Sequence, residues 1–141
     1  MKKLQIIKWH IIFLCTIQFF TYCGTSNILN QVIGKEWKVT SIAGKVLKIS
    51  ELENGLPYMT FGENGILSGF TGCNMFSGSY KLKSNLIYLE PGAITKKACT
   101  DITEMDFLYA LKEVNGWKLE GNDLELLNGE KPVMNLILGG N

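Results

Sequence analysis

Apolar and polar residues alternate along most of the chain after residue 35, a pattern typical of strands with one buried face. Three pairs of such runs flank short segments rich in Gly, Asn, Asp or Ser, and this arrangement predicts β-hairpins. Pro132 stands at the start of the last run, where a missing backbone N–H is tolerated. The predicted strands are residues 36–42, 45–48, 58–61, 66–70, 78–83, 86–89, 117–120, 124–127 and 132–138.

One segment, residues 104–114, has helical periodicity instead. Its start is marked by capping-box spacings and its end by a glycine. We expect this helix to lie as a lid over the apolar face of the sheet, so the sequence predicts a mainly β (α+β) fold, a compact antiparallel sheet or partly closed barrel with one helix packed on it. The apolar positions are Met105, Leu108, Leu111 and Val114, widened by Phe107, and the end signals are Asp101 with Glu104, Thr103 with Asp106, and Gly116.

The N-terminus has the pattern of an export signal. Three lysines precede the mostly apolar residues 9–20, a stretch too short for a comfortable membrane span, which needs about 20 apolar residues. Cys23 ends this stretch and resembles the lipidation site of bacterial lipoproteins, although Phe20 and Tyr22 stand where such sites usually have Leu and a small residue. Plain secretion and an uncleaved anchor are the alternatives. The expected organisation is a signal peptide at 1–22, a short linker at 23–34 and one domain at 35–141.

The four cysteines are consistent with an exported protein. Removal of the signal takes Cys15, and lipid on Cys23 leaves Cys73 and Cys99 as one pair. In an oxidising compartment this pair can form a disulfide, which would stabilise the fold by roughly 3–4 kcal/mol in the chain-entropy model. The alternative is two free buried cysteines that act as small hydrophobic residues.

Composition excludes several classes of function. All 14 basic residues are lysines, and without Lys2, Lys3 and Lys8 the remaining 11 face 13 acidic residues, a net charge of −2. This balance argues against nucleic acid as a partner. His10 is the single histidine and belongs to the signal segment, so no histidine-based triad or histidine metal site is expected in the mature chain. We therefore expect no enzyme activity, no cofactor and no metal.

The densest motif is Gly69–Tyr80, in which Gly69, Gly72 and Gly78 surround Cys73 and Asn74. Gly72 is suited to positive φ, Asn74 can hydrogen-bond to its own backbone, and Gly69 and Gly78 suit bulges or close strand approach. The structural interpretation is a constrained turn. The functional interpretation is a small ligand loop made of Gly72, Cys73, Asn74, Gly78 and Tyr80, with backbone N–H groups and the Asn74 amide exposed.

These motifs, in this order, resemble the META domain family and its HslJ-like heat-shock lipoproteins. The resemblance rests on Gly72-Cys73-Asn74, on Gly78 and Tyr80, on Thr95-Lys-Lys-Ala-Cys99, on Trp37 before Gly44, on residues 57–61, on the helix and on the terminal hairpin. It implies a compact, mainly β domain with one helix, often held in the bacterial envelope by lipid.

Three functions remain as hypotheses. The first is a noncatalytic envelope lipoprotein, in the outer membrane and facing the periplasm or the surface, that supports stress or antibiotic tolerance through binding or assembly. The second is a lipid-anchored inhibitor or modulator of an envelope hydrolase, with Asn74–Phe76 as the insertion loop. The third is a small-ligand carrier or an unrecognised enzyme, which a deep apolar cavity between sheet and helix would favour. The expected partners are the membrane, through the lipid on Cys23, and an envelope protein.

Overall fold

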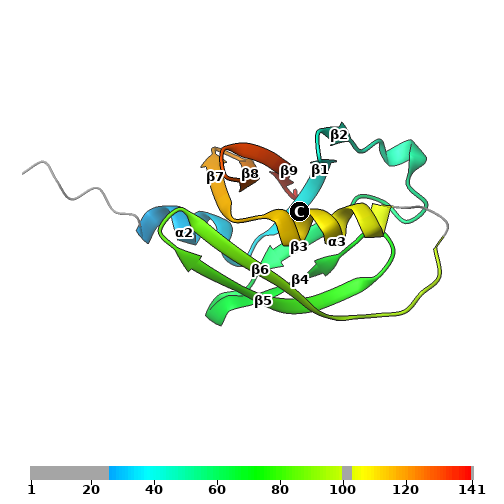
Figure 1. Ribbon diagram of the computed structural model, residues 1–141, viewed down its shortest axis with the longest axis horizontal. Helices are drawn as coiled ribbons and strands as arrows, with labels where there is room; N and C mark the ends of the chain where they lie inside the picture. The colour runs from blue at the N-terminus through cyan, green and yellow to red at the C-terminus, as the bar shows by residue number, and fades with distance from the viewer. Residues whose placement is uncertain (1–25, 100–102, 141) are drawn as a thin grey trace, which may run out of the picture.

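The computed structural model describes residues 26–99 and 103–140. Nine antiparallel strands follow the order β2-β1-β3-β4-β5-β6-β7-β8-β9, and β1 also pairs with β9, so the sheet curls into a ring (Figure 1). The expectations for the signal peptide, for Cys23 and for Asp101 lie outside the described residues. The elements are α2 (Ser26–Val32), β1 (Glu36–Ile42), β2 (Lys45–Val46), η1 (Ile49–Glu51), β3 (Tyr58–Phe61), η2 (Glu63–Gly65), β4 (Ile66–Phe70), β5 (Met75–Lys83), β6 (Leu86–Ile94), α3 (Thr103–Glu113), β7 (Gly116–Glu120), β8 (Asp123–Asn128) and β9 (Lys131–Leu138).

The three predicted hairpins are present, as β3–β4, β5–β6 and β7–β8. Alternation located them correctly because every second side chain of these strands faces the interior, as the burial of β8 illustrates. The strands β5 and β6 are longer than predicted, nine residues each. By contrast, β2 has only two residues, both exposed, so the predicted extension to Lys48 is wrong.

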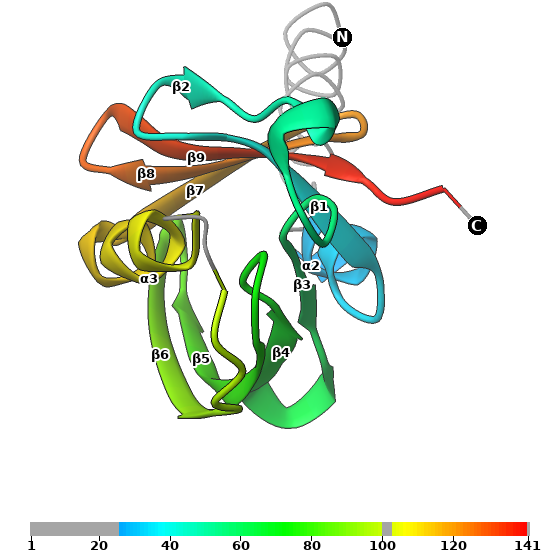
Figure 2. The same cartoon turned by 90° about the vertical axis from the view of Figure 1, so that its right-hand side faces the viewer.

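The ring is nearly open between β6 and β7, where a single residue pair, Leu86 with Gly116, joins the two strands. The helix α3 lies across this opening and contacts β6, β1 and β9 (Figure 2). The predicted lid helix is therefore confirmed, and its position closes the gap between two strands of the barrel.

The buried face of α3 differs from the predicted one at Met105. Phe107, Ala110 and Leu111 are buried, whereas Met105 is 58% exposed. At 100° per residue Met105 lies about 160° around the helix from Phe107, so the two cannot share a face. The largest side chain of the segment, Phe107, determines which side packs inward.

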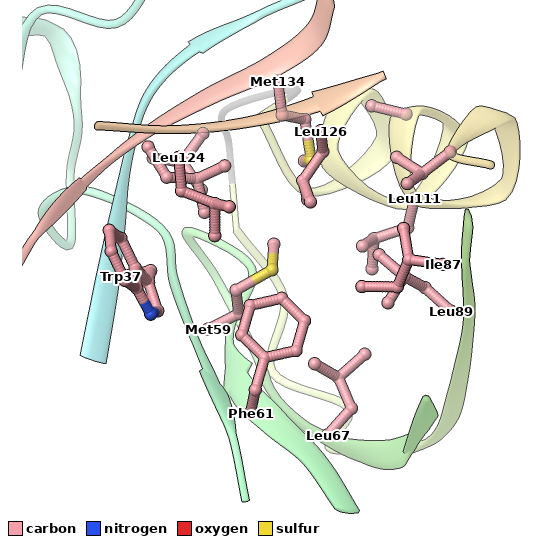
Figure 3. Packing of buried hydrophobic residues seen from close by; sticks show 14 of the residues in the cluster. Trp37, Met59, Phe61, Leu67, Ile87, Leu89, Leu111, Leu124, Leu126 and Met134 are labelled. Atoms are coloured by element: carbon pink, nitrogen blue, oxygen red, sulfur yellow. The ribbon is translucent and has the colours of Figure 1, made fainter. Parts of the chain in front are cut away.

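The core fills the interior of the ring (Figure 3). Its largest enclosed side chains come from five strands (β1, β3, β4, β8 and β9) and from α3, so one continuous apolar cluster holds the ring and the helix together. Burial of the apolar surface of these side chains is the main favourable contribution to the stability of the domain. The largest side chains with less than 2% exposure are Trp37, Met59, Phe61, Leu67, Phe107, Leu111, Leu124, Leu126, Met134 and Leu136.

The helix α2 was not predicted, and it lies in the part of the chain expected to be a linker. Val32 at its end is buried, and its carbonyl accepts a hydrogen bond from Trp37 Nε1 at 3.1 Å. Ile33 then forms a parallel bridge with Phe61. These contacts attach α2 to the ring. Within the described residues, no helix is long and apolar enough to span a bilayer.

Candidate functional site

The motif around Gly72 forms the four-residue loop between β4 and β5. Phe70 and Met75 pair across it, and Gly72 has a φ of 102°, the positive value expected from the sequence. The Thr71 hydroxyl accepts hydrogen bonds from the backbone N–H groups of Cys73 at 3.3 Å and Asn74 at 3.0 Å. The side chain that stabilises the turn is therefore Thr71, and the prediction that Asn74 would bond to its own backbone is wrong.

The amide of Asn74 is buried, at 3% exposure, and joins two other parts of the chain. Its Oδ1 accepts from Thr95 Oγ1 at 2.8 Å and from the Lys97 N–H at 2.7 Å. Its Nδ2 donates to the Lys97 carbonyl at 3.1 Å and to Glu104 Oε2 at 3.0 Å. An amide has two donor hydrogens and two acceptor positions, so the hydrogen-bonding capacity of this side chain is fully used inside the fold.

Glu104 connects this loop to the helix. It lies in the first turn of α3, where a carboxylate also complements the partial positive charge of the helix N-terminus. Its Oε2 accepts a hydrogen bond from Thr71 Oγ1 at 2.5 Å as well as the bond from Asn74. Charge-assisted hydrogen bonds of this kind are roughly twice as strong as neutral ones. We call Thr71, Asn74, Thr95, Lys97 and Glu104 the Asn74 network.

The predicted disulfide joins Cys73 and Cys99 across the same place, with the Cα atoms 6.0 Å apart. Cys73 is buried and directly precedes Asn74. The covalent bond and the Asn74 network therefore both connect the β4–β5 loop to the segment that leads from β6 to α3.

The other two residues of the expected ligand loop lie elsewhere on β5. At a strand rise of about 3.3 Å per residue, Gly78 and Tyr80 are about 13 Å and 20 Å along the strand from Asn74. Gly78 lies at a bulge between Ser77 and Ser79, where the carbonyl of Glu90 leaves no room for a Cβ atom. The predicted close strand approach at Gly78 is confirmed.

Tyr80 points into the barrel interior. Its hydroxyl donates to the Gly62 carbonyl at 2.7 Å, and its ring meets that of Phe61 edge to face with centroids 5.3 Å apart. Burial raises the pKa of this hydroxyl above its ordinary value, because the phenolate would lose its hydration. Tyr80 therefore supports the core.

The proposed insertion loop Asn74–Phe76 does not project from the molecule. Phe76 is 3% exposed and packs on Phe107 of α3 with ring centroids 5.5 Å apart. Met75 is 48% exposed, but it is the first residue of β5 and not a loop residue. The geometry contradicts this part of the inhibitor hypothesis, since alternation along β5 turns Phe76 inward.

Two surface grooves among the described residues are further candidates for binding. One, of about 500 Å³, lies beside α3 and is lined by Ser79, Lys81, Tyr88, Glu90 and Lys112 among others. The other, of about 320 Å³, is lined mainly by apolar side chains next to α2. An apolar space of about 10 Å³ under α2 has room for no more than one water molecule.

In the described part of the chain no cluster of three or more His, Cys, Asp or Glu residues could hold a metal ion. The cysteines of the motif form a disulfide and carry no thiol, so they offer no nucleophile in this state. Sequence reasoning identified Gly72, Cys73 and Cys99 but missed the roles of Thr71 and Glu104. Glu104 was recognised only as an acidic residue at a helix start, because no local pattern reveals a contact over 30 residues.

Comparison with known proteins gives the family. The model of the META domain matches residues 30–138, which is most of the chain. The chain belongs to the META domain family. The matched residues include the end of α2, and they contain the whole Asn74 network and the disulfide.

Two solved structures are similar to this META domain chain. The first, described only as an NMR structure of a protein, is 25% identical, with a TM-score of 0.60 over 77% of this chain and 92% of that one. The second, an NMR structure of a protein from Burkholderia xenovorans, is 18% identical, with a TM-score of 0.60 over 82% of this chain and 88% of that one. The second likeness shows the fold alone. No curated protein matches the sequence.

Proposed function

We propose that this META domain protein is a noncatalytic lipoprotein of the bacterial envelope, anchored through Cys23. The observation that carries the proposal is the disulfide between Cys73 and Cys99. Disulfides persist in oxidising compartments, which agrees with the basic and apolar N-terminal segment that ends at Cys23. Both features favour an exported chain, and the cysteine at the end of the apolar stretch favours lipid as its anchor.

The noncatalytic part of the proposal is supported by the Asn74 network. The Asn74 amide makes its hydrogen bonds within the fold, and its neighbour Cys73 is bonded to Cys99. The Asn74 amide and the Cys73 sulfur therefore stabilise the loop, and neither is free to act on a substrate. The resemblance to HslJ-like lipoproteins adds the role that we propose, which is support of stress or antibiotic tolerance through binding or assembly.

The anchor can be tested by replacing one cysteine. In an expressing bacterium, we expect the wild-type protein to sediment with the envelope membranes and Cys23→Ser to lose its covalent lipid and most of this membrane association. Cys15→Ser is the matched control, because it changes a cysteine of the same apolar stretch and should leave anchoring unchanged. A Cys23→Ser protein that keeps its lipid would contradict the proposal.

A modulator of an envelope hydrolase is a second candidate function, and a segment other than Asn74–Phe76 favours it. Val46 on β2 and Ile49 on η1 are 69% and 66% exposed. The strand β2 pairs with the end of β1, and η1 is the next element along the chain. Exposed apolar side chains close together on one segment suit contact with a protein partner.

Cross-linking in the envelope tests this candidate. A Val46→Ser/Ile49→Ser variant should lose the cross-linked species that the wild-type protein forms. Ile66→Ser, which removes an exposed apolar side chain from β4, should keep it. The same cross-links in both variants would exclude this surface as the contact.

A further inference from the structure

The apolar groove next to α2 has a defined place in the fold. Leu29 of α2, Leu82 of β5, and Trp117 and Leu119 of β7 line it, with Ser84 and Lys118 at its edge. The four apolar side chains are all half-buried, so each keeps part of its surface open to solvent. Figure 1 shows α2, the β5–β6 turn and β7 together at one end of the molecule. We call this surface the α2 groove.

The anchor proposed above lies very close to the α2 groove along the chain. Cys23 precedes Ser26, the first residue of α2, by three residues. Three extended residues span at most about 11 Å. Leu29 follows on the same short helix, so lipid on Cys23 would hold this end of the barrel at the level of the lipid head groups.

We infer that the α2 groove is the face that rests on the bilayer, with Trp117, Leu119 and Leu29 in the interfacial region of the membrane. This inference rests on the proposed anchor at Cys23. Tryptophan is enriched at membrane interfaces, and here the exposed part of the Trp117 ring would supply the contact, because its Nε1 is buried within the fold. The contact needs little affinity of its own, since an anchor a few residues away keeps the groove at a high effective concentration near the lipid.

The charges at this end fit a lipid surface. Lys118 lines the groove and Lys83 at the end of β5 is exposed beside it. Lys118 Nζ lies 2.8 Å from Glu120 Oε1, whereas Lys83 makes no salt bridge within the described residues. A lysine next to apolar side chains can hold its stem along them and place its ammonium among the head groups.

Quenching of tryptophan fluorescence by brominated lipid tests the inference. The protein, expressed from the full-length sequence and purified from membranes in detergent, is reconstituted into phosphatidylcholine and phosphatidylglycerol vesicles with or without brominated acyl chains. All variants carry Trp9→Phe, which leaves Trp37, only 1% exposed, and Trp117 as emitters. We expect brominated lipid to lower the emission, and Trp117→Phe to remove most of this loss.

A matched control moves the reporter to the other end of β5. Met75 is 48% exposed and lies about 26 Å along the strand from Lys83. In the variant that combines Trp117→Phe with Met75→Trp, the new tryptophan should not be quenched. Equal quenching at both positions, or none at Trp117, would overturn the inference.

The intact mass of the same preparation separates this inference from the proposed function. If Cys23 carries lipid and Trp117 is not quenched, the docking face is wrong and the anchor stands. If Cys23 carries no lipid, the proposed function is overturned and the docking inference falls with it. A last control excludes residual detergent as the cause of quenching. Brominated lipid is added to protein that is already in vesicles without bromine, and quenching should appear only after the lipid has exchanged into those vesicles.

Discussion

At the scale of a single residue, hydrogen bonds explain why the polar side chain of Asn74 occupies a position with 3% exposure. A buried amide without partners would destabilise the fold, whereas this one is hydrogen-bonded to Thr95, Lys97 and Glu104. Those partners belong to two segments more than 20 residues away. Asn74 therefore determines how the β4–β5 loop, the Thr95–Lys97 segment and α3 meet.

Asn74→Ala should lower the free energy of unfolding by at least about 3 kcal/mol, because it leaves the Lys97 backbone groups and the Glu104 carboxylate without these bonds. Urea unfolding monitored by circular dichroism measures the change. Asn122→Ala, at an exposed position of the β7–β8 turn, is the control and should stay within about 0.5 kcal/mol of wild type. A similar small change for Asn74→Ala would show that the network does not stabilise the loop.

Tyr80 makes stability depend on pH in the alkaline range. Its folded-state pKa is raised above the ordinary value of 10.0, so the unfolded chain ionises first. The contribution of Tyr80 to the free energy of unfolding is fully present below about pH 10, and it is lost as the pH rises through the folded-state pKa. The decrease in the free energy of unfolding from about pH 9 to about pH 11 should be larger for wild type than for Tyr80→Phe. Tyr88→Phe, at an exposed position, should follow wild type. Equal losses in all three proteins would contradict the role given to Tyr80.

The sequence was informative about these residues where the backbone alone sets the requirement. The positive φ of Gly72 and the close approach at Gly78 follow from the lack of a Cβ atom. The partners of Asn74 could not be predicted, since an asparagine in a glycine-rich turn equally suits a local hydrogen bond. Only the fold brings Glu104 to it.

Gly78 shows at the scale of elements how β5 and β6 fit together. The register of this hairpin shifts between Ser77 and Ser79, where two residues of β6, Pro91 and Gly92, face Gly78 alone. A Cβ atom at Gly78 would meet the backbone of Glu90 and Gly92. A bulge of this kind bends the strand and increases its twist, which helps a long hairpin follow the curvature of a closed sheet. The glycine is therefore needed for the shape of the β5–β6 hairpin.

Gly78→Ala should lower the free energy of unfolding by about 3 kcal/mol or more, because its Cβ would lie 2.6 Å from the Gly92 nitrogen and still closer to the Glu90 carbonyl. Gly140→Ala is the matched control, since nothing lies within 4 Å of the added atom there. Thermal unfolding of the two variants side by side makes the comparison. Equal melting temperatures would mean that the hairpin tolerates a side chain at this position.

The elements themselves were largely predictable, and their assembly was not. Hairpins depend on neighbouring residues, so alternation and turn residues located them. The closure of the ring depends on β1 pairing with β9, for example Trp37 with Leu138, and no local pattern reports such a distant pair. The seven-residue α2 was missed because an isolated helix of that length is marginal without the ring on which Val32 packs.

At the scale of the whole molecule, the structure separates a stabilised end from the end where the chain enters the domain, close to the proposed membrane anchor. The Asn74 network and the disulfide lie at the start of β5, while the α2 groove lies at its other end. This arrangement suits a domain held by its N-terminus in an oxidising compartment, where the covalent bond compensates for a small core. The central claim is that the mature protein is both lipidated at Cys23 and closed by the Cys73–Cys99 bond.

The measurement that tests this claim most directly is the intact mass of the protein extracted from its native membrane, taken with and without a reductant. We predict a chain that begins at Cys23, carries the added mass of a diacylglyceryl group and a fatty acyl group, and gains the mass of two hydrogens on reduction. An unlipidated chain with three free thiols would contradict the account and reopen Cys23, Cys73 and Cys99 as reactive groups.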